Sequence, residues 1–322
     1  MTPTAMKVGI SAVFDPAVTP HARTFLRALA AGRNLIPGLA GVQWHWLDDG
    51  ADPRQAAMVA QQMVEWGADL VLGHFSSDAA LAAAPLYARH QIALLTPAAT
   101  LQDLTRFPNV LRGCPSDRQL AGELLAWAIS RLWQRLYVQA DDSAHGQALA
   151  AAIRHSALAH GLQPVTDREQ ADAEVFAGRL KSSCAYLQAR RRAGCSRPLI
   201  FTDDAVSPFF GTGQPVGDQP QATWVIGFHP GPEDCPAARQ HRQWFASPAQ
   251  TYYRESLRLL HGIGVLARRN LPDRRALLDA LCNEVLATPL GPLAFLQNEI
   301  RDASTQLWHL GPQGLQPVTP TF

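Results

Sequence analysis

Cysteine is scarce in this chain, and the few cysteines are scattered. Five occur in 322 residues, and no two of them are separated by only two residues. The CxxC pairs of zinc ribbons and redox centres are therefore missing, and the odd count argues against a disulfide framework. Free thiols fit a reducing compartment slightly better than an oxidising one. The cysteines are Cys114, Cys184, Cys195, Cys235 and Cys282.

Long apolar runs and an excess of charge of either sign are also missing. No stretch is long and apolar enough to suggest a transmembrane helix. Lys and Arg number 28 against 27 Asp and Glu, a net charge of +1, so we expect no nucleic-acid partner and no attraction to an anionic membrane. The densest positive cluster, Arg190–Arg192, is interpreted as a solvated helix face.

The first residues, MTPTAMKVGISAVF, lack the charged start, apolar run and cleavage site of a signal peptide. If Met1 is the native start, we expect the protein in the cytoplasm. If a leader has been removed, we expect it in the periplasm. The sequence leaves both alternatives open.

The sequence is rich in short apolar runs that alternate with longer amphipathic ones. Hydrophobic residues make up 47% and charged residues 17%, a globular balance, and 322 residues favour two compact lobes over one small core. The alternation predicts a parallel sheet covered by helices on both faces. In the first part of the chain we expect strands at 6–13, 42–47, 69–73 and 92–95, and helices at 21–31, 53–66 and 79–89.

The same alternation restarts after Gly113, Cys114 and Pro115, residues that suit a segment crossing to a second α/β lobe. A late helical block followed by strands indicates that the chain returns to the first lobe before it ends. The expected strands are 136–139, 173–178, 198–202, 224–228, 291–296 and 305–310, and the expected helices are 119–133, 146–160, 182–193, 236–244, 252–268 and 274–285.

Polar side chains follow two of the expected strands, where open α/β sheets bind their ligands. Ser76, Ser77 and Asp78 come after the third strand and could cap the next helix, or could hold a small carboxylate at its N-terminus. After the fourth strand, Pro97 turns the chain and Thr100 follows. On local chemistry alone, a plain cap is the simpler interpretation of both segments.

Enzyme and metal interpretations find little support. Ser77 and His74 could be a nucleophile and a base, but the Gly-x-Ser-x-Gly elbow is missing. The paired acids Asp48/Asp49 and Asp203/Asp204 would need a partner at a defined distance. We therefore expect no enzyme, no cofactor and no metal. The weaker candidates are Gly211–Gly213, too short for a phosphate loop, and His229, Cys235 and His241, too loosely spaced for a metal site.

Several segments, taken in order along the sequence, resemble segments of a known protein family. Val71–Ser77 (VLGHFSS), Ala84–Tyr87 (APLY) and Ile92–Thr100 (IALLTPAAT) resemble the bacterial leucine/isoleucine/valine-binding protein family. The resemblance covers nearly the whole chain and is stronger in the first lobe. The further segments that fall in family order are Asp48–Ala56, Arg112–Asp117, Ala140–Gly146 and Gly291–Leu293.

The resemblance implies a type I periplasmic-binding-protein fold, in which two Rossmann-like lobes with parallel sheets are joined by a three-segment hinge. The expected lobes are residues 1–115 with 231–302, and residues 116–230 with 303–322. The resemblance also implies that Ser77 and Thr100, with Ala98 and Ala99 beside them, grip the carboxylate and ammonium of an amino acid. The acidic residue that faces the ammonium falls at Asp203 or Asp204, and we favour Asp204.

Two residues depart from the family pattern and leave the ligand's side chain open. His145 and Arg179 stand where the family has aromatic residues. Arg179 could pair with a second carboxylate on the ligand, pair with Asp203 or Asp204, or point into solvent. The family's cysteine pair is replaced by Ala51 and Ser76.

From the resemblance we expect a substrate-binding receptor that passes a small amino-acid-like or amide ligand to an ABC permease. The alternative is a cytoplasmic sensor that acts through a regulatory partner protein, as in the amide-sensing negative regulator of amidase expression, which has the same fold. The missing leader and the lost cysteine pair motivate that alternative.

Overall fold

The computed structural model describes residues 5–212, 222–230, 236–269 and 271–318. The chain divides into two compact units. Unit 1 comprises Met1–Pro115 and Pro230–Ala303, and unit 2 comprises Ser116–His229 and Ser304–Phe322. The chain therefore passes between the units three times, and each unit is described by itself below.

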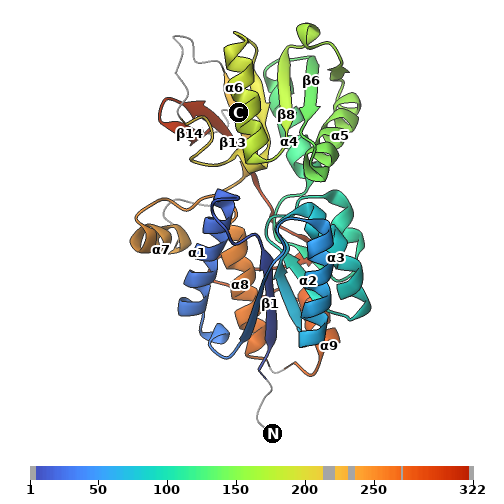
Figure 1. The fold of residues 1–322 in the computed structure, drawn as a ribbon, viewed down its shortest axis with the longest axis vertical. Coiled ribbons are helices and arrows are strands. Elements are labelled where there is room, and N and C mark those ends of the chain that lie inside the picture. The colour runs from blue at the N-terminus through green and yellow to red at the C-terminus, as the bar shows by residue number, and fades with distance from the viewer. Residues whose placement is uncertain (1–4, 213–221, 231–235, 270, 319–322) are drawn as a thin grey trace. The chain divides into compact units, whose positions relative to one another are not determined.

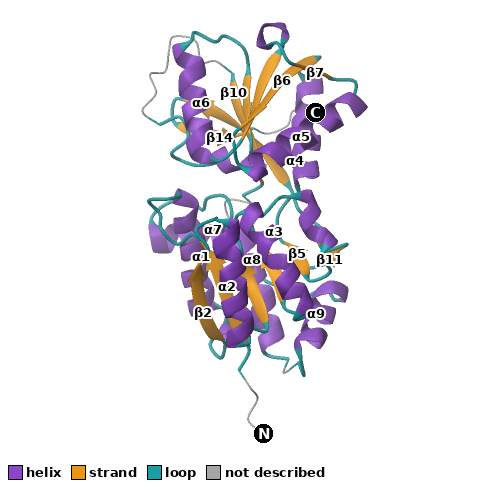
Figure 2. Ribbon diagram, turned by 45° about the vertical axis from the view of Figure 1, so that its right-hand side comes forward, coloured by secondary structure: helices purple, strands orange, loops and turns teal. Residues whose placement is uncertain are grey.

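Unit 1 is built on a seven-stranded sheet in the order β11-β12-β5-β4-β3-β1-β2. Its strands pair in parallel except for the hairpin of β11 and β12. The sheet lies between two layers of helices (Figure 2). The strands are β1 (Lys7–Ala12), β2 (Gln43–Asp48), β3 (Leu70–Gly73), β4 (Ala93–Thr96), β5 (Val110–Arg112), β11 (Phe295–Leu296) and β12 (Glu299–Ile300).

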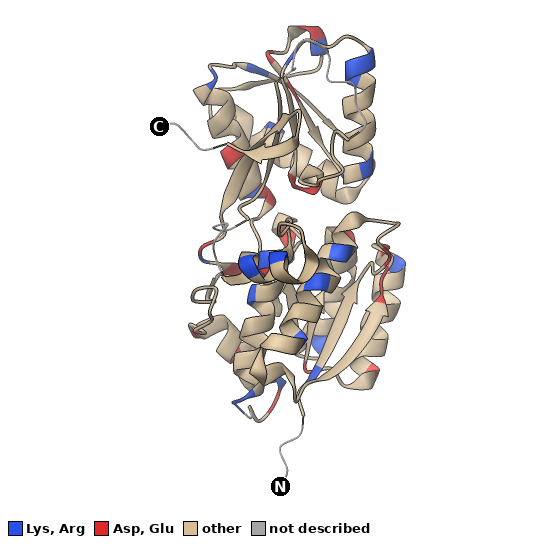
Figure 3. Cartoon of the chain, turned by 90° about the vertical axis from the view of Figure 1, so that its left-hand side faces the viewer, with Lys and Arg blue, Asp and Glu red and all other residues tan. Residues whose placement is uncertain are grey.

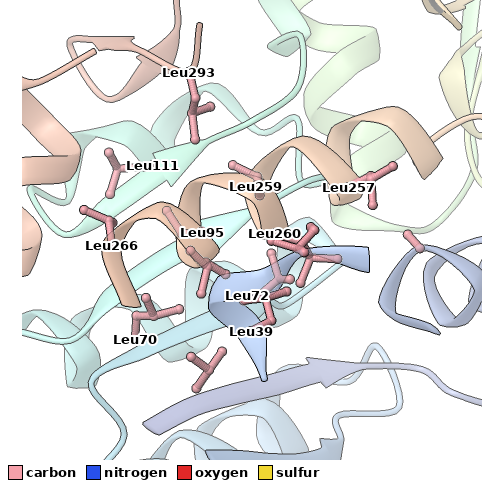
Figure 4. Packing of buried hydrophobic residues seen from close by; sticks show 14 of the residues in the cluster. Leu39, Leu70, Leu72, Leu95, Leu111, Leu257, Leu259, Leu260, Leu266 and Leu293 are labelled. Atoms are coloured by element: carbon pink, nitrogen blue, oxygen red, sulfur yellow. The ribbon is translucent and has the colours of Figure 1, made fainter. Parts of the chain in front are cut away.

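Alternate residues of the unit 1 strands enter two separate hydrophobic cores. Leu70 and Leu72 of β3 face the core under α1, α8 and α9, whereas Val71 faces the core under α2 and α3. Helix α8 lies across the first core, and Figure 4 shows Leu257, Leu259, Leu260 and Leu266 above the strands. The helices are α1 (Pro20–Leu35), α2 (Pro53–Trp66), α3 (Ser77–Arg89), α7 (Pro236–Phe245), α8 (Tyr253–Ala267) and α9 (Arg274–Asn283), with short 3-10 turns η1 (Pro37–Leu39) and η2 (Gln102–Arg106).

Unit 2 has a seven-stranded sheet in the order β14-β13-β10-β9-β8-β6-β7. Strands β6, β8, β13 and β14 of this sheet are labelled in Figure 1. Strands β6 to β10 pair in parallel, and β13 and β14 add an antiparallel edge. The strands are β6 (Arg135–Ala140), β7 (Gln163–Val165), β8 (Ala173–Ala177), β9 (Leu199–Phe201), β10 (Thr223–Phe228), β13 (Thr305–Gly311) and β14 (Gly314–Pro317). The helices are α4 (Asp117–Ser130), α5 (Ala144–Ala159) and α6 (Leu180–Arg192), with 3-10 turns η3 (Arg168–Gln170) and η4 (Asp203–Ala205).

The expected α/β class, with two mostly parallel sheets, is confirmed. The predicted strand over 291–296 is shorter in the structure, because only Phe295–Leu296 forms a ladder, whereas Leu293 makes an isolated antiparallel bridge with Leu286. The short strands β5, β7, β12 and β14 were not predicted, since two to four residues carry too little periodicity. Both signs of charge occur on each unit (Figure 3).

Each sheet reverses its strand order at one point, between β1 and β3 in unit 1 and between β6 and β8 in unit 2. Loops that leave the carboxyl ends of neighbouring strands diverge at such a point, which makes it the usual ligand site of an open α/β sheet. Ser77 follows β3, and His145 and Arg179 follow β6 and β8, which are the strands at these points, whereas Thr100 follows β4 and Asp204 follows β9, one strand further away.

Candidate functional site

Gly73 closes β3 and directs the chain toward the candidate residues of unit 1. Its φ is +135°, a conformation that other residues rarely adopt. A Cβ atom at this position would lie 1.9 Å from the backbone oxygen of Ser11 on β1. The close approach of β3 to β1 therefore requires glycine at the start of the loop that leads to Ser77.

Ser77 lies in the first turn of α3 and is buried. The N-cap residue is Ser76, and its side chain makes no capping hydrogen bond. The Ser77 hydroxyl oxygen instead accepts the backbone N–H of Leu101, at 3.4 Å. Ser76 therefore holds the N-cap position without a side-chain cap, and Ser77 joins the two loops that follow β3 and β4.

The loop after β4 is tied to the loop after β3 a second time. Thr96 donates its hydroxyl to the backbone oxygen of His74 at 3.1 Å and accepts the N–H of Ala99 at 3.0 Å. Ala98, Ala99 and Thr100 are buried in this loop. Thr100 does not cap the following turn, because the N-cap of η2 is Leu101. The structure thus brings Ser77 and the Ala98–Thr100 segment together.

A buried polar network that we did not predict supports these loops. The Nδ1 atom of His74 lies 2.8 Å from Asp49, and its Nε2 atom lies 3.1 Å from the hydroxyl of Tyr87. Ser11 donates its hydroxyl to Asp49 at 2.9 Å. Burial alone would raise the pKa of Asp49, but the hydrogen bond and charge of His74 and the bonds from Ala51 and Ser11 lower it. Burial next to Asp49 raises the pKa of Tyr87.

This network also bears on the hydrolase alternative. Both ring nitrogens of His74 are engaged, one by Asp49 and one by Tyr87. The Ser77 hydroxyl contacts Leu101 and not His74. The pair therefore lacks the hydrogen bond through which a histidine activates a serine nucleophile.

His145 lies in the first turn of α5 in unit 2, beside the buried carboxylate of Asp203. Its Nε2 atom is 3.5 Å from Asp203. Burial would lower the pKa of His145, but the negative charges of Asp203, Asp117 and Asp204 raise it to about 10. His145 is therefore a cation at neutral pH, with Asp203 as its nearest carboxylate.

Asp204 and Arg179 both lie at the N-terminus of α6. The Asp204 carboxylate accepts the N–H of Leu180 at 3.0 Å. Arg179 is the N-cap residue, its side chain is exposed, and its own N–H goes to Asp141 at 2.8 Å. Asp204 thus combines a helix-capping role with a place next to the His145 cluster.

Asp141 is a second residue that sequence reasoning did not single out. It follows β6 at the reversal point of the unit 2 sheet, and it accepts hydrogen bonds from Ser143, Ser182 and Arg179. Burial would raise its pKa, but these bonds lower it. A Cβ on Gly146 or Gly178 would lie within 2.6 Å of this carboxylate, so the glycine after His145 makes room for Asp141.

Within the described ranges, no cluster of His, Cys, Asp and Glu could hold a metal ion, and no helix could span a membrane. The candidates Cys235 and Gly213 lie outside the described residues. Among the described cysteines, no disulfide bond is formed by Cys114, Cys184, Cys195 or Cys282.

A comparison with known protein families identifies the family to which this chain belongs. A periplasmic binding protein family model matches residues 17–187, which is more than half of the chain. The chain belongs to this family. This periplasmic binding protein is also 30% identical over 123 residues to the Leu/Ile/Val-binding protein BraC3 of Rhizobium johnstonii, covering 37% of the chain and 34% of the relative.

The matches to curated relatives span about a third of those proteins. The Leu/Ile/Val-binding protein of Escherichia coli is 31% identical over 110 residues, 33% of the chain and 30% of the relative. The expected resemblance to the leucine/isoleucine/valine-binding family is confirmed.

Solved structures match over nearly the whole length. The leucine binding protein LivK from Thermotoga maritima has a TM-score of 0.85 at 14% identity, covering 98% of both chains. An ABC transporter substrate-binding protein from Desulfitobacterium hafniense in complex with Leu has a TM-score of 0.80 at 18% identity, covering 98% of this chain and 100% of that one. At such identities the likeness shows the fold, and the expected type I periplasmic-binding-protein fold is confirmed.

Proposed function

We propose that this periplasmic binding protein binds a small, carboxylate-bearing, amino-acid-like ligand, and that Ser77 and Thr100 contact it. The observation that carries the proposal is the double tie between the two loops, Thr96 to His74 and Ser77 to Leu101. The ties hold a buried hydroxyl and a run of backbone groups at the carboxyl ends of β3 and β4. A carboxylate needs such donors, and small Ala98 and Ala99 let it approach the backbone.

We also propose ligand contacts for polar residues of unit 2. His145, Asp203 and Asp204 form a compact group in which negative charge exceeds positive charge. Such a group favours the ammonium of an amino acid, and Asp204 is the proposed acceptor. Arg179, exposed at the N-terminus of α6, is the proposed contact for a further anionic group on the ligand.

The ligands of the structural neighbours support a carboxylate as the shared feature. Related solved structures hold leucine, isoleucine, 3,4-dihydroxybenzoic acid and benzoate. All four molecules carry a carboxylate, and only two carry an ammonium. Aromatic acids are therefore the second ligand class that we propose to test. Several of these neighbours are ABC transporter proteins, and we propose delivery to an ABC permease as the role of binding.

A thermal-shift screen tests the proposal, because a ligand that binds only the folded protein raises its melting temperature. The panel contains the twenty amino acids, their amides, dicarboxylates and benzoates. We expect stabilisation by one or more free acids, increasing with ligand concentration. Stabilisation by amides alone would favour the amide-sensing alternative, and no stabilisation by any carboxylate would refute the proposed ligand class.

A further inference from the structure

Arg112 ends β5 and is the largest fully buried side chain among the described residues. It pairs in register with Thr96 of β4 on one side and with Glu299 of β12 on the other. The loop that carries Ala98, Ala99 and Thr100 leaves β4 directly beside it. A guanidinium is thus buried next to the candidate site without being one of the predicted contacts.

The Arg112 guanidinium binds the backbone of that loop. Its Nη1 atom donates to the carbonyl oxygens of Thr100 at 2.6 Å, Leu101 at 2.7 Å and Ala99 at 3.4 Å. Three successive carbonyls therefore converge on one nitrogen. Hydrogen bonds from a charged donor are shorter and stronger than those between neutral groups, so this contact fixes the orientation of three peptide groups.

Glu299 holds the guanidinium in place from the opposite side. One of its carboxylate oxygens accepts the Nη2 of Arg112 at 3.1 Å. The same oxygen accepts the side chains of Gln102 at 3.3 Å and Thr105 at 3.4 Å. A residue nearly two hundred positions later in the chain thus anchors both Arg112 and the turn η2.

The direction of the carbonyls determines the direction of the N–H groups. In a planar trans peptide the C=O and the following N–H point in opposite directions. Carbonyls of Ala99, Thr100 and Leu101 that face Arg112 therefore turn the N–H groups of Thr100, Leu101 and Gln102 away from it. The Leu101 N–H lies on the Ser77 side, where it reaches the Ser77 hydroxyl.

We propose that Arg112 is a positioning residue of the candidate site, which orients the three peptide groups between residues 99 and 102 so that the Leu101 N–H reaches the Ser77 hydroxyl and the N–H groups of Thr100 and Gln102 face a ligand carboxylate beside Ser77. The inference rests on the proposed function for the identity of the ligand group. The orientation of the peptide groups in this loop does not depend on which ligand binds.

Lysine cannot replace Arg112 in this role. A lysine ammonium is a single point of charge, whereas the planar guanidinium serves the three carbonyls with one nitrogen and Glu299 with another. Arg112→Lys therefore keeps the positive charge but no longer orients the three peptide groups of the loop.

The matched control is Arg258→Lys. Arg258 is also buried in unit 1, donates to the carbonyl of Pro292 and pairs with Asp302, but contacts neither loop. Both variants are examined by amide hydrogen exchange of residues 99–102 in the ligand-free protein, and by calorimetry with L-leucine and L-leucinamide as probes.

We expect Arg112→Lys to speed amide hydrogen exchange in residues 99–102 by about tenfold relative to Arg258→Lys. We also expect it to weaken the affinity for L-leucine at least tenfold, and the affinity for L-leucinamide by less. Unchanged exchange in this loop overturns the inference whatever the protein binds. Equal losses for the acid and the amide also overturn it, since the N–H groups would then not favour the carboxylate.

A second variant distinguishes a loss of positioning from a folding defect caused by Arg112→Lys. Glu299→Gln keeps Arg112 and its carbonyl bonds but removes the opposing charge, and we expect a smaller effect in the same direction. If the wild-type protein binds no carboxylate at all, the proposed function fails, and the exchange of residues 99–102 in Glu299→Gln and Arg112→Lys still decides whether Arg112 positions the loop.

Discussion

The hydroxyl oxygen of Ser77 accepts the backbone N–H of Leu101, and this contact joins the loops that follow β3 and β4. The two residues are 24 positions apart and belong to different strand–loop segments of unit 1. Their hydrogen bond links the two loops. Mutations that disturb either loop should therefore change the properties of both.

Gly73→Ala tests the close approach on which the first loop depends. The new Cβ would meet the Ser11 backbone at 1.9 Å, and alanine would also have to adopt a φ of +135°. We expect the free energy of unfolding to fall by about 2–4 kcal/mol, measured by chemical denaturation. Gly122→Ala is the control, because a Cβ there meets nothing within 4 Å and Gly122 lies inside α4. A similar effect of the two substitutions would contradict the structural role of Gly73.

Glu255→Gln tests a buried carboxyl in the first turn of α8. Burial raises the pKa of Glu255 to about 7, and hydrogen bonds from its own N–H and that of Tyr252 oppose this rise only in part. The unfolded chain loses this proton near its ordinary pKa of 4.5, whereas the folded protein keeps it up to about 7. Glu255 therefore lowers stability progressively as pH rises from 4.5 to 7.

The amide of Glu255→Gln cannot ionise, so we expect the variant to be more stable than the wild type above neutral pH by on the order of 2 kcal/mol. Urea denaturation at several pH values measures the difference. Glu123→Gln, an exposed position on α4, is the control and should leave the pH profile unchanged. A constant difference between Glu255→Gln and the wild type from pH 4.5 to 8 would rule out the raised pKa.

His145→Gln tests the charge of the cluster in unit 2. The folded-state pKa of about 10 lies above the ordinary value of 6.5, so the stabilisation is complete below 6.5 and is lost as pH rises toward 10. We expect the melting temperature of the wild type to fall over this window more than that of His145→Gln. His155→Gln, exposed on the same helix, is the control. Parallel curves for the wild type and His145→Gln would show that Asp203 does not hold the imidazole protonated.

Much of the fold could be predicted because its signals are local. The buried strand Leu70–Gly73 and the amphipathic helix Pro53–Trp66 carry their periodicity within a few residues, and Pro53 and Gly67 mark the ends of that helix. The two-residue strands β11 and β12 have no such signal. Strand β12 forms where Glu299 pairs with Arg112, a contact between distant parts of the chain, and β11 pairs with β12.

The candidate site was predictable only in part, for the same reason. Ser77 and Thr100 stand beside strand ends in family order, which is visible in the sequence. The partners of His74 and Arg112 are not, because Asp49, Tyr87 and Glu299 reach them through the fold. The available signal was a His or Arg at the end of a strand next to small residues, but this signal does not identify the residue that the side chain contacts.

Isothermal titration of the wild type, Ser77→Ala and Thr100→Ala with the acid that stabilises the wild type most tests the central claim. We expect each substitution to weaken binding by about 1–3 kcal/mol, because it leaves a buried group of the ligand without its partner. Ser130→Ala, exposed at the end of α4, should not change the affinity. Wild-type affinity in both Ser77→Ala and Thr100→Ala would contradict the assignment of these loops as the ligand site.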